Sequence, residues 1–260
     1  MKDTFGRTNR AVPQVWFRLR MSQDWQETAE AARESGRPVE AGSTPTLWGE
    51  ALHGAKNPLV LRGCVEIENA TSFDHASDIV GAFLIEQLSA WQRTSADFFY
   101  LSVRRALEEF QIDGALAALS SAKEEALVQH IGLSVEGPAL AVASMWRFHD
   151  AFETVMVKRN PACEDDYQQV KQTADSRRVG VVTRSPFDWG SGRFFGDDEW
   201  QLGAAYLSLL ARGNPVIVSV ESASQITRCI DAERAVVDDS IDFSEIYGRY
   251  QAAGASYAKP

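Results

Sequence analysis

Five charged or thiol side chains stand near the expected ends of short β-rich runs, where a parallel α/β fold gathers its functional groups. They are Glu40, Cys64, Glu66, Arg105 and Arg184. Two guanidinium groups facing one or two carboxylates suit a carboxylate or phosphate ligand, because guanidinium holds such groups through paired hydrogen bonds. The same side chains would alternatively form an internal salt-bridge network, and both interpretations stay open.

Arg62, Cys64 and Glu66 alternate along one β-rich run, so a period of two predicts that they share a face. Cys64 would act as a nucleophile if a positive neighbour lowered its pKa, although a buried and inert thiol is the commoner state of a cysteine. The four histidines show no metal-ligand spacing. We therefore expect no metal site.

Strand and helix patterns alternate along the chain and must position these groups. The runs expected as strands are Gln14–Leu19, Pro38–Ala41, Leu59–Glu66, Phe98–Val103, Val128–Leu133, Thr154–Val157, Val179–Thr183 and Val216–Val220. The helical patterns are Trp25–Ser35, Trp48–Gly54, Ala76–Arg93, Ile112–Ala126, Pro138–Phe148, Asp165–Asp175, Asp198–Ala211 and Ala223–Ala232. Such alternation predicts βα units around a parallel sheet. A further amphipathic pattern, Ser240–Gln251, predicts a C-terminal helix.

Length and composition limit the remaining choices. The 260 residues suit one barrel domain, which we expect to span the whole chain. A net charge of −10 without a basic tract argues against nucleic acid and anionic membrane as partners. No apolar run approaches the ~18 residues of a membrane span. The three widely spaced cysteines suit a reducing, cytoplasmic location.

Six segments, in order, resemble motifs of the aldo-keto reductase superfamily. Phe5-Gly6-Arg7-Thr8 with Val12-Pro13 is similar to the N-terminal hairpin of that family. The later matches are Asp97–Arg105, Ala115–Ser134, Phe152–Pro161, Val179–Gly192 and Asn214–Ala232. The resemblance implies an α/β fold: a single (β/α)8 TIM barrel of the aldo-keto reductase type, with an N-terminal hairpin and a C-terminal helix.

The positions that the resemblance assigns to catalysis hold other residues. Family members use a tyrosine acid, an aspartate, a lysine and a histidine, with NADP(H) as the hydride donor. The aspartate position falls on Ala41, or on Glu40 if the alignment slips by one. The lysine position falls on Cys64, and the histidine position on Arg104-Arg105. No tyrosine follows the second strand, and Arg184 replaces the tyrosine that stacks on nicotinamide.

The positions that the resemblance assigns to the cofactor are eroded as well. They are Ser134, Ser185, Ser219, Ser222, Gln225 and Arg228. The first two are retained serines, whereas Ser219, Gln225 and Arg228 stand where the family grips phosphate and adenine. Ser222 opens a capping-box pattern at a helix start, where backbone amides are able to hold an anion.

Three functions remain open. The preferred one is a diverged barrel, a pseudoenzyme that has lost NADPH-dependent carbonyl reduction and binds a small anionic ligand or a partner protein. The second is a lyase or isomerase acting on an anionic small molecule through Arg105, Arg184 and a carboxylate. The third is an NADP(H)-dependent oxidoreductase with relocated catalytic residues. Tyr100 is not expected to be the relocated acid of such an oxidoreductase. Side chains alternate between the two faces of a strand, so Tyr100 should lie on the face opposite to Arg105 and point out of the barrel.

A protein contact or a lid is expected from the aromatic loop after the seventh strand. Its aromatic residues are Trp189, Phe194, Phe195 and Trp200. Exposed aromatic clusters of this kind often mark interfaces, although packing on the barrel rim would use the same side chains.

Overall fold

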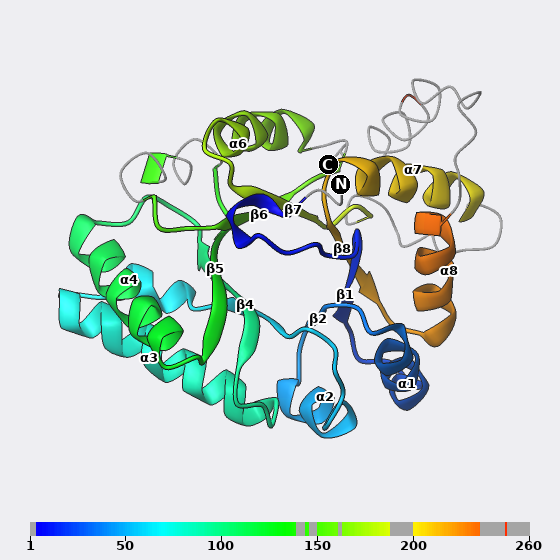
Figure 1. Ribbon diagram of the computed structural model, residues 1–260, viewed down its shortest axis with the longest axis horizontal. Coiled ribbons are helices and arrows are strands. Elements are labelled where there is room, and N and C mark those ends of the chain that lie inside the picture. Colours follow the sequence, from blue (N-terminus) through cyan, green and yellow to red (C-terminus); the bar gives the residue numbers. More distant parts are fainter. Residues whose placement is uncertain are drawn as a thin grey trace, which may run out of the picture.

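The chain forms a barrel of parallel strands surrounded by helices (Figure 1), as the computed structural model shows for residues 4–138, 144–145, 150–160, 163–187, 200–234 and 248. Its eight strands run in the order β2-β1-β8-β7-β6-β5-β4-β3, all parallel to their neighbours. A parallel bridge between Val39 and Leu59 joins the two outermost strands. The predicted (β/α)8 barrel is therefore confirmed.

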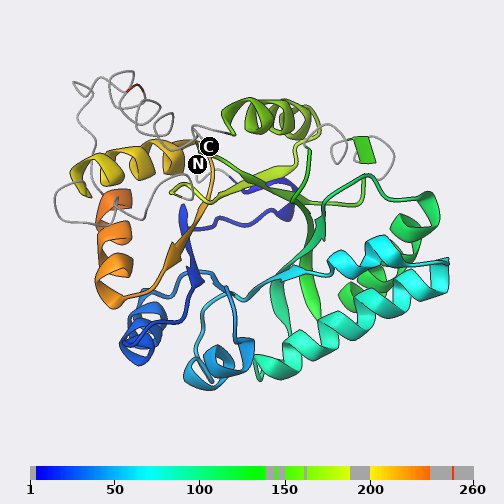
Figure 2. The same cartoon turned by 180° about the vertical axis from the view of Figure 1, so that it is seen from behind.

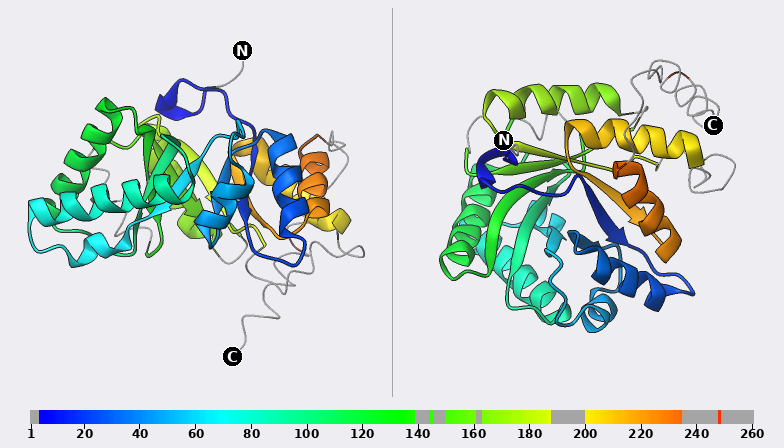
Figure 3. Two further views of the ribbon diagram at one scale, coloured as in Figure 1. Left: turned by 90° about the horizontal axis from the view of Figure 1, so that it is seen from below. Right: turned by 45° about the vertical axis from the view of Figure 1, so that its right-hand side comes forward.

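The element bounds follow the sequence patterns closely. The strands are β1 (Val15–Leu19), β2 (Val39–Ala41), β3 (Val60–Gly63), β4 (Ala96–Val103), β5 (Val128–Val135), β6 (Thr154–Lys158), β7 (Gly180–Arg184) and β8 (Val216–Val220). The helices are α1 (Trp25–Ser35), α2 (Pro45–Ala51), α3 (Phe73–Ala90), α4 (Glu109–Glu124), α6 (Glu164–Ser176), α7 (Trp200–Gly213) and α8 (Ala223–Arg234). Seen from behind, these helices ring the barrel (Figure 2), and α8 packs beside α1 (Figure 3).

Two hydrophobic clusters lie on the two faces of the strands. One fills the space between the strands and the helices. The other fills the barrel interior and consists of Phe5, Trp16, Val60, Phe98, Tyr100, Met156, Val182 and Ile217. The barrel is therefore plugged by side chains up to its middle, and polar side chains begin only at the next inward positions toward the strand ends.

The N-terminal segment, which the sequence predicts as a hairpin, closes the bottom of the barrel. It is a single 3-10 turn, η1 (Gly6–Thr8), and the Phe5 amide donates to the Arg10 carbonyl at 2.8 Å. Gly6 has a φ of 53°, and a Cβ there would lie 2.1 Å from the Gly180 nitrogen. The turn packs so closely on the start of β7 that only glycine fits at position 6.

Tyr100 points into the barrel, so the expectation that it faces outward is wrong. Its side chain is fully buried beside Phe98, with the two ring centroids 6.3 Å apart. The expectation assumed that side chains alternate between the two faces of the strand as far as Arg105. However, β4 ends at Val103, so Arg105 lies beyond the regular alternation. Within the strand, the even-numbered positions are the inward ones.

Three expectations fall largely outside the described residues. These are the helix over Pro138–Phe148, the C-terminal helix over Ser240–Gln251 and the aromatic loop at Trp189, Phe194 and Phe195. Trp200 is described, and it begins α7.

Candidate functional site

Five charged side chains form an arc around the inside of the barrel mouth, at the C-terminal ends of the strands. In order around the barrel they are Arg18 on β1, Glu40 on β2, Arg62 on β3, Glu136 after β5 and Arg184 on β7. Their signs alternate, beginning and ending with arginine. We call this set the mouth arc. In TIM barrels this end carries the functional groups.

Arg62 is the centre of the mouth arc. It donates to Glu40 Oε1 through Nε at 2.9 Å and through Nη2 at 2.7 Å. Its Nη1 donates to Glu136 Oε1 at 2.7 Å. One guanidinium therefore joins carboxylates from two separate strands by charge-assisted hydrogen bonds.

The two outer arginines, Arg184 and Arg18, each have one carboxylate partner, whereas Arg62 has two. Arg184 Nη2 donates to Glu136 Oε2 at 2.5 Å and to the Val135 carbonyl at 3.1 Å. Arg18 Nε lies 3.5 Å from Glu40 Oε1, which is long for an ion-pair contact. Each outer arginine thus reaches one carboxylate that Arg62 already engages.

The mouth arc is largely removed from water. Glu40 and Arg184 are 4% and 5% exposed. The Arg62 side chain is 9% exposed, whereas that of Arg18 is 32% exposed. Buried charges of this kind persist only when they are paired, because each unpaired ion costs several kcal/mol of desolvation.

The pKa values of the mouth arc follow from this pairing. Burial acts to raise the pKa of Glu136, but Arg184 and Arg62 outweigh it, and the net pKa is lowered. Burial likewise acts to lower the pKa of Arg62, yet Glu40 and Glu136 raise it overall. Arg184 differs, because burial prevails and its pKa is lowered. Glu136 is consequently a poor general base near neutral pH.

We expect Glu136 to make the fold sensitive to acid. A folded-state pKa below the ordinary 4.5 means that its ion pairs add stability above that value, and that this stability is lost as the pH falls through the folded pKa. Urea unfolding measured from about pH 6 down to about pH 3 should show falling stability, with a smaller decline in Glu136→Gln. The exposed Glu30→Gln should decline like the unmodified protein, and an equal decline in Glu136→Gln would contradict the assignment.

Cys64 and Glu66 do not share a face with Arg62, so that expectation is wrong. The strand ends at Gly63, and Cys64 takes a left-handed conformation with φ 73°. A 3-10 turn, η2 (Val65–Asn69), follows and carries Glu66 to the surface. Cys64 packs instead among the buried hydrophobic residues between strands and helices.

The Cys64 thiol is not suited to act as a nucleophile. Burial raises its pKa to about 12, and Glu66 adds to the shift. Burial also raises the pKa of Cys229, which is fully buried. Both thiols remain protonated at neutral pH, and only thiolates react rapidly.

Thiol labelling tests this placement. Cys163 is the partly exposed cysteine of the three, so a maleimide should modify one thiol quickly in the native protein and all three after unfolding in urea. Cys163→Ser should remove the fast reaction. Rapid labelling that survives this replacement would place Cys64 or Cys229 at the surface and contradict the fold described above.

Arg105 lies outside the mouth arc. It follows β4, its side chain is 55% exposed, and its Nε is 3.9 Å from Glu68 Oε2. Arg104 donates to the same carboxylate through its backbone and its side chain. The predicted pair of Arg105 with Arg184 is therefore not formed; Arg62 and Arg18 take that place.

The serine and cofactor positions are engaged in local structure. Ser134 Oγ donates to Glu136 Oε1 at 2.8 Å, and the Ser185 carbonyl accepts from Asn160. Ser222 Oγ accepts from the Gln225 amide, while the Gln225 side chain accepts from the Glu221 amide.

Two further cofactor positions differ in their surroundings. Arg228 lies 5.7 Å above the Trp200 ring. Ser219 is partly exposed and takes an inward position on β8, because Ile217 belongs to the interior cluster.

Sequence reasoning missed Arg18 and Glu136. A signal for both was present, since each is two residues beyond an inward side chain of its segment, Trp16 in β1 and Ser134 in β5. The family motifs drew attention to other positions, and Glu136 lies just past the last residue of its strand.

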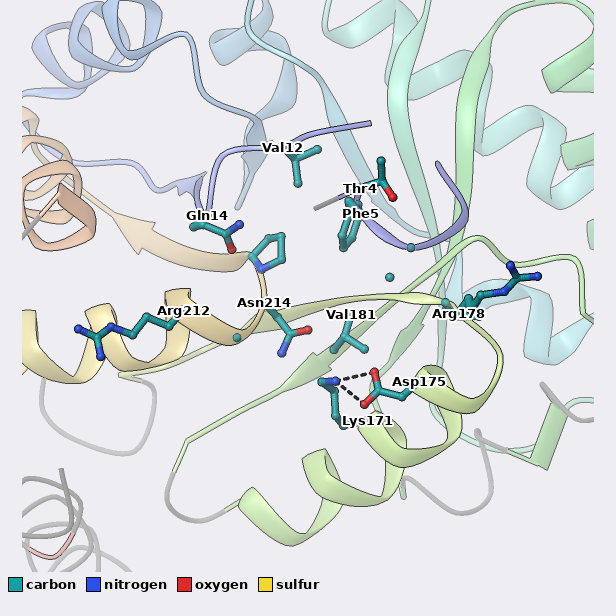
Figure 4. Close-up of a pocket in the computed structure, with 15 residues that line it drawn as sticks. Thr4, Phe5, Val12, Gln14, Lys171, Asp175, Arg178, Val181, Arg212 and Asn214 are labelled. Atoms are coloured by element: carbon teal, nitrogen blue, oxygen red, sulfur yellow. Dashed lines mark hydrogen bonds and ion pairs between the residues drawn. The ribbon is translucent and has the colours of Figure 1, made fainter. Parts of the chain in front are cut away.

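A hollow of about 450 Å³ lies at the end opposite to the mouth arc, where the strands begin (Figure 4). Phe5, Val12 and Asn214 help to line it, and the Lys171–Asp175 ion pair lies at its edge. Figure 4 shows the guanidinium groups of Arg178 and Arg212 pointing away from the hollow. The guanidinium groups of Arg178 and Arg212 therefore do not face a common point inside this hollow.

Within the described ranges, no group of three or more His, Cys, Asp and Glu side chains is arranged to hold a metal ion. In the same part of the chain, every helix is too short or too polar to cross a membrane.

Comparison with known proteins identifies the fold. No family model matches the sequence, and no curated protein matches it. Among solved structures, an aldo-keto reductase from a Medee basin deep-sea metagenome library superposes with a TM-score of 0.72 at 12% identity, covering 95% of this chain and 94% of that one. An aldo-keto reductase from Brucella melitensis gives 0.68 at 13% identity, covering 96% and 98%.

A holo-form aldo-keto reductase from Bacillus halodurans gives a TM-score of 0.64 at 14% identity, with coverage of 98% and 95%. The chain therefore has the barrel of the aldo-keto reductases over nearly its whole length. Fold alone does not determine the reaction, so function has to be argued from the site.

Proposed function

We propose that this barrel of the aldo-keto reductase type has lost NADPH-dependent carbonyl reduction and works as a binding protein for a small anionic ligand. One observation carries the proposal: the barrel mouth is occupied by the connected ion pairs of Glu40, Arg62, Glu136 and Arg184. Carbonyl reduction needs a proton donor at this place, and a guanidinium keeps its proton throughout the neutral pH range.

The interior tyrosine, Tyr100, is not suited to be that donor. Tyr100 lies inside the barrel, fully buried, and burial raises the pKa of its hydroxyl. An acid that protonates a carbonyl has to be accessible to it and needs a pKa closer to neutrality. Tyr100 meets neither condition, which argues against an oxidoreductase with relocated residues.

The described residues do not fit a nicotinamide cofactor. The position of the stacking tyrosine holds Arg184, whose guanidinium is buried and paired with Glu136. The oxidised nicotinamide ring carries a positive charge, so Arg184 and Arg18 would repel it. The Gln225 side chain, at the expected adenosine-phosphate position, caps α8 instead.

A lyase or isomerase is less well supported than a binding protein. Such an enzyme needs a base or nucleophile whose pKa lies near the working pH. Glu136 is held ionised by two arginines, and Cys64 is held protonated away from the mouth.

The proposed location of the protein is the cytoplasm. Its three free cysteines support this proposal, because thiols stay reduced in that compartment.

The proposal is tested by a turnover assay. The purified protein, at high concentration with NADPH and a panel of aldehydes and ketones, should give no absorbance loss at 340 nm above that of a control without protein. An aldo-keto reductase assayed in parallel supplies the positive control. Protein-dependent oxidation of NADPH coupled to alcohol formation would overturn the proposal.

A further inference from the structure

Among the described residues, the mouth arc has no charged side chain on β8, and we call this its open side. Arg18 on β1 stands in register with Ser219 on β8, and Arg184 on β7 stands in register with Ile217 on the same strand. The two terminal arginines therefore lie on the strands that flank β8. Among the described residues, β8 contributes no carboxylate between them, and its inward side chain nearest the strand end is Ser219.

The charges of the mouth arc do not balance. Three guanidiniums face two carboxylates, and Arg62 donates hydrogen bonds to both. Arg184 and Arg18 are left with one contact each to a carboxylate that is already shared. The Nε atoms of both outer arginines are buried without a hydrogen bond. A partly buried cluster with one excess positive charge favours a negative partner.

The open side is also where solvent reaches the cluster. Ser219 is partly exposed, and the Arg18 side chain is 32% exposed. Arg184, by contrast, is 5% exposed. A small anion entering here would meet the partly exposed guanidinium of Arg18 and the buried one of Arg184, with Ser219 on the strand between them. Burial lowers the pKa of Arg184 and outweighs the opposing effect of Glu136, while Arg62 and Arg18 also lower it; an anion nearby would offset these two positive neighbours.

We propose that the anionic group of a small ligand, a carboxylate or phosphate, binds between Arg18 and Arg184 against the Ser219 hydroxyl and supplies the negative charge that the mouth arc lacks. The inference rests on the proposed binding function and names its ligand class and its subsite. Guanidinium pairs recognise both groups through paired hydrogen bonds, so the shared chemistry is a compact oxyanion.

A designed carboxylate at Ser219 gives the first test. Ser219→Asp places a negative charge between the two arginines, and Ser219→Asn has nearly the same shape without the charge. At low ionic strength and neutral pH, we expect Ser219→Asp to melt at a temperature several degrees above that of Ser219→Asn. Equal melting temperatures, or a lower one for the aspartate variant, would overturn the proposal. The pair shares any steric cost, so a fold defect lowers both.

Binding of simple oxyanions gives the second test. Sodium phosphate and sodium oxalate, each added at constant ionic strength, should raise the melting temperature of the unmodified protein, and calorimetry should give the affinity. We expect Arg18→Met to weaken binding by about tenfold or more, and Ser219→Asp to abolish it. Tighter binding of phosphate would indicate a phosphate-bearing ligand, and tighter binding of oxalate would indicate a carboxylate-bearing ligand.

Two results would contradict the subsite. One is an absence of stabilisation by either anion; the other is binding that Arg18→Met and Ser219→Asp leave unchanged. A failure of the proposed function can be told apart from a failure of the subsite. NADPH turnover is measured in the unmodified protein and does not depend on these variants. A protein that oxidises NADPH and also loses oxyanion binding in Ser219→Asp would refute the proposed function and keep the subsite.

Discussion

Replacing Arg62 by methionine is expected to lower the free energy of unfolding by about 3–5 kcal/mol, the range found when one partner of a buried ion pair is removed. The reason is that Glu40 and Glu136 both depend on this guanidinium, and the side chains of Arg62 and Glu40 are 9% and 5% exposed. Methionine keeps much of the apolar stem, so the loss reports on charge more than on packing. Urea unfolding at neutral pH gives the number.

Lys171→Met is the matched control for Arg62→Met. Lys171 also pairs with a carboxylate, but Asp175 is 58% exposed and the pair lies on the surface of α6. Exposed pairs at this spacing contribute about 0.3–0.5 kcal/mol, so the control should be nearly silent. Similar losses in the two variants would mean that the mouth arc is solvated and loosely held.

Replacing Trp16 by alanine is expected to cost about 3–5 kcal/mol as well, for a different reason. Trp16 is fully buried inside the barrel, with ring centroids 6.0 Å from Phe5 and 5.1 Å from Phe98. Its Nε1 donates to the Pro13 carbonyl at 2.8 Å. Alanine would leave a cavity between the N-terminal turn and the strands.

Trp16→Phe separates the cavity from the hydrogen bond. It keeps an aromatic ring in the interior and loses the Nε1 donor, so its cost should be clearly smaller than that of Trp16→Ala. Urea unfolding of the two variants at neutral pH provides the comparison. A loss below ~1 kcal/mol for Trp16→Ala would show that the barrel interior is not packed as described.

The fold could be predicted from the sequence because its strongest patterns are periodic and local. Trp25–Ser35 was predicted to the residue, and Gly36 explains why, since it ends the helix with a φ of 62° and donates to the Arg33 carbonyl. The motif segments from Asp97 onward place β4 to β8 in order. Six weak matches in one order specify a barrel better than any one of them does.

The N-terminal turn was harder to predict. The Phe5-Gly6-Arg7-Thr8 motif located it correctly at the barrel bottom, but the 3-10 conformation of Gly6–Thr8 was not predicted. The Gly6 contact with Gly180 joins residues far apart in the chain, and local patterns contain no information about such contacts.

The candidate site could be predicted only in part. Glu40 and Arg184 were expected at the strand ends, and the alternative interpretation as a salt-bridge network describes their geometry together with Arg62. Cys64 and Glu66 were misplaced because a single left-handed residue ends the alternation of β3. Strand length at the C-terminal end decides which side chains enter the mouth, and neither propensity nor period determines it to one residue.

A calorimetric titration of the purified protein with NADPH and NADP⁺ tests the central claim most directly. The mouth arc predicts no binding of either nucleotide up to about 1 mM, because Arg184 fills the nicotinamide position and Gln225 is committed to the cap of α8. Micromolar binding would contradict the account. It would mean that the cofactor site survives its substitutions and that this barrel still belongs to redox chemistry.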